Sequence, residues 1–145
     1  MSYNGNTAEV VSSAEEKKAI IPTVSLPKKE IERLNQFLLL KAGSCTSRKI
    51  DSTTILMHTC GSNYNFKEVN IDYEVDRIGF KPNDLVKFPD SEGGGIALFI
   101  GVSSDYKEAF FLHEKSPQGL IYWPGLNTVE QFAEKGFAKI SISAD

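Results

Sequence analysis

The stretch from Lys81 to Ile142 constrains the fold most, because short apolar segments alternate there with tight turns. The turns are rich in Gly, Pro, Ser and Asp, which supply the backbone angles that tight turns need. Each apolar segment has the length of a short strand rather than of a helix. We therefore predict five strands, at residues 84–88, 96–102, 109–114, 120–123 and 137–142.

A short helix is predicted between the last two of these strands, over residues 129–135. Asn127 or Thr128 is suited to cap its N-terminus, and Glu130 or Gln131 follows at the spacing of a capping box. Gly136 lies where a helix-terminating glycine is usually found. The predicted order is thus four strands, a short helix and a closing strand.

This order of elements resembles that of SH3-like small β-barrels, over less than half of the chain. Strand number and spacing also fit an OB-like barrel or a curled open sheet. Residues 123–127 keep the proline found near the fourth strand of signalling SH3 domains, as Pro124, but bring no Tyr beside it. The resemblance therefore implies a barrel architecture and no particular ligand.

A longer helix is predicted before the barrel, from about Pro27 to Ala42. Ile31, Leu34 and Phe37 recur at the spacing of one helical face, and Gly43 follows as a terminator. Leu39 and Leu40 widen the apolar stripe beyond one face. A helix this apolar must cover either its own barrel or another molecule, and packing on its own barrel is the preferred interpretation.

A β-hairpin is predicted between this helix and the barrel, from segments 49–59 and 68–76. In the second segment Val69, Ile71, Tyr73 and Val75 alternate with polar residues, so one face is apolar and the other acidic and solvated. The predicted fold is a β-rich α+β domain: an SH3-like barrel (77–145) with the helix and hairpin (25–76) packed on it. We expect residues 25–145 to form one globular domain and residues 1–24 to be a disordered tail.

Charge argues against nucleic acid as the main partner. The chain has 145 residues, a formal net charge of −3 and a sequence pI of about 5.4. Residues 1–50 hold eight Lys and Arg against five Asp and Glu, whereas residues 51–145 hold eight against fourteen. An acidic barrel repels phosphate, so nucleic-acid binding through a basic N-terminal arm is kept only as an alternative. No apolar run is long enough for a membrane span, and we expect a soluble cytoplasmic protein.

Residues for catalysis or metal binding are few. Cys45 or Cys60, with His58 or His113 as base, would supply the minimal parts of a thiol-dependent enzyme, which is the second alternative. No second cysteine pair accompanies Cys60, and the Glu92–Gly95 loop is not followed by the residues of a phosphate-binding loop. We therefore expect no metal and no cofactor.

Aromatic residues gather around the third and fourth strands of the predicted barrel. Small barrels bind extended peptides on such surfaces, and ring faces attract cations. Neighbouring acidic residues would favour a basic or methylated peptide. The sequence thus predicts a non-enzymatic protein–protein interaction module or assembly subunit, anchored by Trp123. The predicted contact residues are Asp105, Tyr106, Glu108, Phe111, Tyr122 and Trp123.

Overall fold

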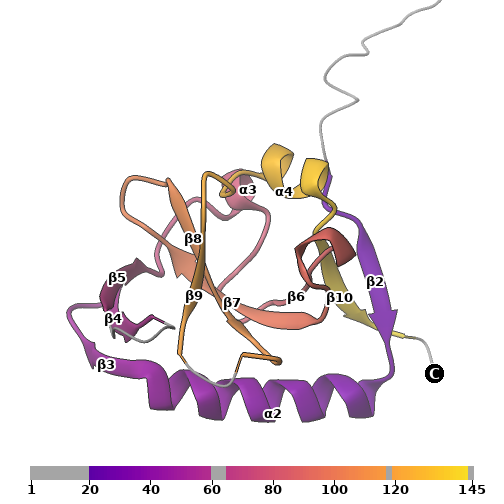
Figure 1. Cartoon of the computed structure of the whole chain (residues 1–145), viewed down its shortest axis with the longest axis horizontal. Coiled ribbons are helices and arrows are strands. Elements are labelled where there is room, and N and C mark those ends of the chain that lie inside the picture. Colours follow the sequence, from indigo (N-terminus) through magenta and orange to yellow (C-terminus); the bar gives the residue numbers. More distant parts are fainter. Residues whose placement is uncertain (1–19, 60–64, 117–118, 144–145) are drawn as a thin grey trace, which may run out of the picture.

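A mixed, open β-sheet between helices is the framework of the protein. The computed structural model describes residues 20–59, 65–116 and 119–143, which contain nine strands and three α-helices. The helix α2 (Lys28–Cys45) covers one face of the sheet, and α3 (Val75–Ile78) and α4 (Val129–Lys135) cover the other (Figure 1). The strands are β2 (Thr23–Leu26), β3 (Thr46–Lys49), β4 (Thr54–His58), β5 (Phe66–Asn70), β6 (Leu85–Lys87), β7 (Ile96–Val102), β8 (Glu108–His113), β9 (Ile121–Pro124) and β10 (Ala138–Ile142).

The SH3-like small barrel predicted from the sequence is wrong. The strands run in the order β2-β10-β6-β7-β5-β4-β3, and β8 and β9 branch from β7. One edge of β7 pairs with β8, while its other edge pairs with β6 and, at Val102, with β5. The composition of the turns indicates where each strand begins and ends, but it does not indicate which strands pair. Several of the observed pairs join strands that are distant in sequence. The result is an open sheet of nine strands among the described residues, not a closed barrel of five.

β2 is an edge strand that the sequence pattern did not reveal. It lies between Pro22 and Pro27 and pairs in parallel with β10, from Thr23 opposite Lys139 to Leu26 opposite Ile142. Its side chains are mostly exposed, so it lacks the alternation of a half-buried strand. The strand includes residues 23 and 24, which the sequence placed in the tail. Residues 20–22 of the predicted tail are also described, and Ile21 among them is buried, whereas residues 1–19 lie outside the described residues.

The predicted hairpin exists as β4 and β5, but β5 ends at Asn70. The alternation continues to Val75, yet these residues serve other elements. Tyr73 donates a hydrogen bond of 2.8 Å from its hydroxyl to the Phe80 carbonyl, and Val75 begins α3. Residues 71–76 therefore lead from the sheet into a helical turn.

The core has two halves, one on each face of β7, which is buried over its whole length. Leu98 faces the half that contains Leu34 and Leu38 of α2, whereas Phe99 faces the half that contains Phe132 of α4. A β-bulge between residues 99 and 101 shifts the register with β8. The strand is thus apolar on both sides because a helix layer covers each side.

Both ends of α4 agree with the prediction. The Thr128 hydroxyl accepts a hydrogen bond of 3.3 Å from the Gln131 backbone N–H. The Gln131 side chain in turn accepts one of 3.1 Å from the Thr128 backbone, which completes a capping box. Gly136 ends the helix with a φ of 97°, a left-handed angle that suits glycine.

Candidate functional site

The orientation of α2 is determined by its contacts with the sheet. Leu34, Leu38 and Cys45 are buried against β7 and β8. Lys41 donates a hydrogen bond of 3.0 Å from its ammonium group to the backbone carbonyl of His113, at the end of β8. These contacts determine which side of α2 faces the sheet and which side faces solvent.

Three large apolar side chains of α2 remain exposed. The exposed fraction is 76% for Leu40 and 47% for both Phe37 and Leu39. Single exposed apolar residues are normal on protein surfaces, whereas these three fall within four positions of one helix. We call Phe37, Leu39 and Leu40 the outer apolar surface of α2.

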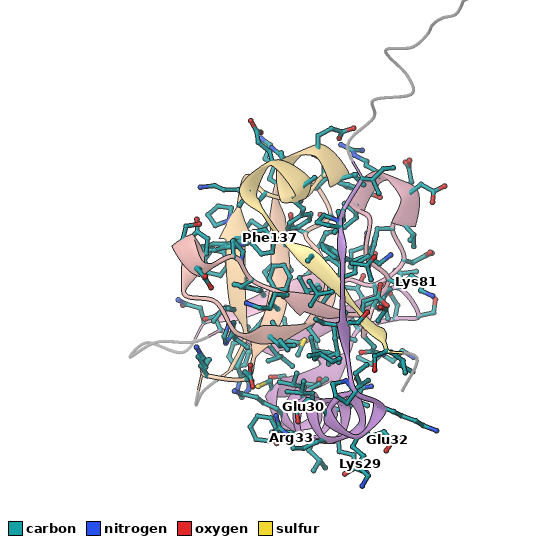
Figure 2. The ribbon with its side chains drawn as sticks, turned by 90° about the vertical axis from the view of Figure 1, so that its right-hand side faces the viewer. Lys29, Glu30, Glu32, Arg33, Lys81 and Phe137 are labelled. Carbon is teal, nitrogen blue, oxygen red and sulfur yellow. The ribbon has the colours of Figure 1, made fainter. Side chains whose placement is uncertain are left out.

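The N-terminal half of the same helix is charged. Glu30 and Arg33 form an ion pair one turn apart, and the hydrogen bond from Arg33 lowers the pKa of the Glu30 carboxyl. Lys29 and Glu32 project from α2 away from the sheet (Figure 2). A rim of both signs of charge therefore borders the outer apolar surface on its N-terminal side.

Two of the predicted contact residues, Phe111 and Trp123, lie on the face covered by α3 and α4. Phe111 has no exposed surface. Trp123 is partly buried and stacks on Phe88, with ring centres 6.0 Å apart. Its indole Nε1 is buried. Packing within the core therefore accounts for both side chains.

Tyr122 and Glu108 lie on the opposite face, joined by a residue that the sequence analysis did not include. The Lys67 ammonium group lies 4.8 Å from the centre of the Tyr122 ring and 3.6 Å from the Glu108 carboxylate. Lys67 belongs to β5, whereas Glu108 and Tyr122 belong to β8 and β9. No signal near Lys67 in the sequence predicts this contact, which joins strands far apart in the chain.

Asp105 and Tyr106 belong to the turn between β7 and β8. Asp105 accepts hydrogen bonds from the Ser103 hydroxyl and the Lys107 backbone, and these bonds lower the pKa of its carboxyl. The Tyr106 hydroxyl accepts a bond of 3.0 Å from the Glu74 backbone N–H. The six predicted residues thus lie in three places, and their role in partner binding stays a prediction.

The residues considered for thiol chemistry are separated or engaged. Cys45 is buried in the α2 half of the core, and Cys60 lies outside the described residues. His113 donates from Nε2 to the Gly94 carbonyl at 2.8 Å and accepts at Nδ1 from the Lys115 backbone N–H, which assigns the proton to Nε2. A Cβ at Gly95 would lie 2.5 Å from the His113 ring, so the glycine loop packs tightly on the histidine.

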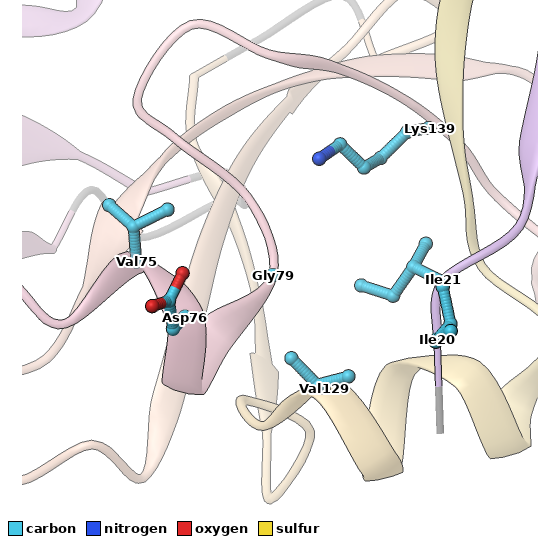
Figure 3. A pocket seen from close by; sticks show the side chains of 7 residues that line it. All are labelled: Ile20, Ile21, Val75, Asp76, Gly79, Val129 and Lys139. Atoms are coloured by element: carbon cyan, nitrogen blue, oxygen red, sulfur yellow. The ribbon is translucent and has the colours of Figure 1, made fainter. Parts of the chain in front are cut away.

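A groove of about 290 Å³ opens where the segment before β2 crosses α3 and α4 (Figure 3). Ile21 packs over Gly79 so closely that a Cβ on the glycine would lie 2.5 Å from its Cδ1. The groove is therefore formed largely by the packing of this segment on Gly79 and its neighbours. Its lining residues are Ile20, Ile21, Val75, Asp76, Gly79, Val129 and Lys139.

A second, polar hollow of about 270 Å³ lies on the solvated face of the β4–β5 hairpin. Carboxylates, hydroxyls and an amide line it, in agreement with the acidic face predicted for the hairpin. In the described parts of the chain, no three His, Cys, Asp or Glu side chains are placed to hold a metal ion. The lining residues are Thr53, Thr54, Glu68, Asn70, Asp72 and Ser104.

Comparison of the chain with models of protein families, with curated proteins and with solved structures found no match. Among the helices of residues 20–59, 65–116 and 119–143, none has both the length and the apolar character needed to cross a membrane. The fold and its surface describe the class of protein: a mixed-sheet domain with helices on both faces of the sheet and exposed apolar side chains on one helix.

Proposed function

We propose that this protein is a non-enzymatic protein–protein interaction module, or a subunit of a larger assembly, that binds its partner through the outer apolar surface of α2. The observation that carries the proposal is the 76% exposure of Leu40, beside Phe37, on a helix whose opposite side is already packed on the sheet. Burying one such side chain stabilises a complex by roughly 1.5–3 kcal/mol.

The surroundings of Leu40 support a protein partner. Interfaces place apolar and aromatic residues at the centre and charged residues at the rim, which is the arrangement of Phe37 and Leu40 beside the Glu30–Arg33 pair. A helix surface of this kind docks against another helix or in an apolar groove. The expected partner is therefore a folded or helical protein surface rather than an extended peptide.

Fewer observations support the two alternatives, a thiol-dependent enzyme and a nucleic-acid-binding protein. A thiol enzyme based on Cys45 would have to expose a side chain that is packed in the core, and both ring nitrogens of His113 are engaged by backbone groups. For nucleic-acid binding, Arg33 is paired with Glu30, and Lys41 is bonded to the sheet. Those two cations contribute less to phosphate binding than isolated ones would.

Site-specific photo-crosslinking tests the proposal. A photoreactive phenylalanine analogue replaces Leu40 in one variant, and in a control variant it replaces Lys81, an exposed residue just after α3. We expect a protein adduct from position 40 and none from position 81 when cells that produce the protein are irradiated. Absence of any adduct at position 40, in a variant with unchanged circular dichroism, would rule out this surface.

A further inference from the structure

We infer that the partner of the outer apolar surface is a second copy of this chain, with the two α2 helices packed antiparallel about a two-fold axis. This inference rests on the proposed function and names the partner for the same surface. It follows from the pattern of side chains along α2, from the charges that this pattern brings together, and from the open space beside it.

One row of α2 is complementary to itself. Arg33, Phe37, Leu40 and Ser44 follow at intervals of four, three and four, so they lie along one side of the helix. These intervals read the same in both directions. An antiparallel pair centred between Phe37 and Leu40 therefore sets Phe37 of each copy against Leu40 of the other, and Arg33 against Ser44.

The charges favour this arrangement over a parallel one. The last turn of α2 contains no basic residue, and its carbonyl groups carry partial negative charge. Antiparallel packing brings Arg33 of each copy, with its ion-pair partner Glu30, to that turn of the other copy. A parallel pair would instead set Arg33 against Arg33.

The surface beside the row leaves room for a second helix. A Cβ built on Gly43 would meet no atom within 4 Å, and Ser44 is small and exposed. Packed helices lie with their axes about 8–10 Å apart when side chains at the contact allow it. Small residues at the C-terminal end of the row permit such an approach, while Phe37 and Leu40 supply the buried area.

The molar mass of the full-length chain, measured by sedimentation velocity over a concentration series, tests the inference. We expect the mass to rise from one chain to two as concentration increases, and Leu40→Lys to abolish the rise. Ile142→Lys is the control: the same apolar-to-charged change at an exposed residue of β10, outside α2, leaves the dimer intact. A wild-type chain that stays monomeric throughout, or a dimer that survives Leu40→Lys, overturns the inference.

A mixing experiment tests the antiparallel register. Phe37→Glu and Leu40→Lys each make the protein monomeric, but a mixture of the two forms a heterodimer, because one contact keeps Phe37 against Leu40 and the other pairs Glu with Lys. A parallel dimer gives no such rescue, so its absence overturns the register. The photo-crosslink separates the two claims: an adduct of other mass at position 40 refutes the second copy and retains the interaction surface.

Discussion

The ammonium group of Lys41 and the backbone carbonyl of His113 are joined by a hydrogen bond of 3.0 Å between α2 and the end of β8. Because this bond helps determine the rotation of α2, it also keeps Leu40 pointing to solvent. The proposed surface therefore depends on this orientation of the helix, which substitution of Lys41 tests.

Lys41→Met should lower the free energy of unfolding by about 1–2 kcal/mol, since it keeps the aliphatic stem and removes a partly buried, charged hydrogen bond. Urea unfolding at a fixed protein concentration measures the change. Lys29→Met, on the exposed side of the same helix, should change stability by less than about 0.5 kcal/mol. Equal effects of the two substitutions would show that the bond to His113 contributes nothing.

Gly79→Ala should destabilise the protein by about 1–3 kcal/mol, because the residue has a φ of 92° and an added Cβ would collide with Ile21. Gly43→Ala is the matched control within a helix, with no atom near the new methyl group, and should stabilise by roughly 0.5–1 kcal/mol. Chemical unfolding of both variants at one protein concentration checks the opposite signs.

Trp123 should emit at short wavelength and resist quenching by iodide, because its ring stacks on Phe88 and its Nε1 is buried. Trp123→Ala should cost on the order of 2–4 kcal/mol of stability through the cavity that it leaves. Tyr122→Ala, at a neighbouring but exposed position, loses its contacts with Lys67 and with the Phe110 ring and should cost about 1–2 kcal/mol. A red-shifted, readily quenched tryptophan would contradict this packing.

Alkaline pH should unfold the protein partly through Tyr73. Burial, and after it the Asp84 carboxylate, raise the pKa of the Tyr73 hydroxyl above its ordinary value of about 10. The stability linked to this shift is fully present below pH of about 10 and is lost as the pH rises further, because the unfolded chain then releases the proton first. Ultraviolet absorbance of tyrosinate, followed together with circular dichroism, should show one tyrosine that ionises only on unfolding.

Tyr73→Phe should remove that part of the alkaline dependence. At neutral pH it should also cost about 1–2 kcal/mol, since the Phe80 carbonyl loses its hydrogen-bond donor. Tyr122→Phe serves as the control, because its hydroxyl is on an exposed side chain. An unchanged alkaline transition in Tyr73→Phe would mean that another group governs unfolding at high pH.

Much of the secondary structure was predictable, because local chemistry determines it. Strand β7 was predicted with its observed bounds, and α4 was recognised from Thr128, Gln131 and Gly136, whose capping roles depend only on near neighbours. β2 was missed because its exposed side chains carry no periodic pattern. It is a strand only through its pairing with β10, which local propensity does not encode.

The architecture and the site were harder to predict, for the same physical reason. The lengths and spacings of strands do not determine which edge of β7 receives β5, β6 or β8, so a closed barrel and an open sheet looked alike. The aromatic pattern around Phe111 and Trp123 indicated a surface, but covering by α3 and α4 makes it core. The better signal was the width of the apolar stripe at Leu39 and Leu40, which exceeds what one sheet can bury.

The parallel pairing of β2 with β10 also bears on the order in which the protein is completed during synthesis. The hydroxyl oxygens of Ser25 and Ser141 lie 3.5 Å apart although 116 positions separate the two residues in the sequence. β2 can therefore pair only after β10 has been synthesised (Figure 1). Only Pro27 separates β2 from α2. Leu34 and Leu38 pack on β7 and β8, which precede β10 in the chain, so the pairing of β2 with β10 is the last part of this sheet to be completed.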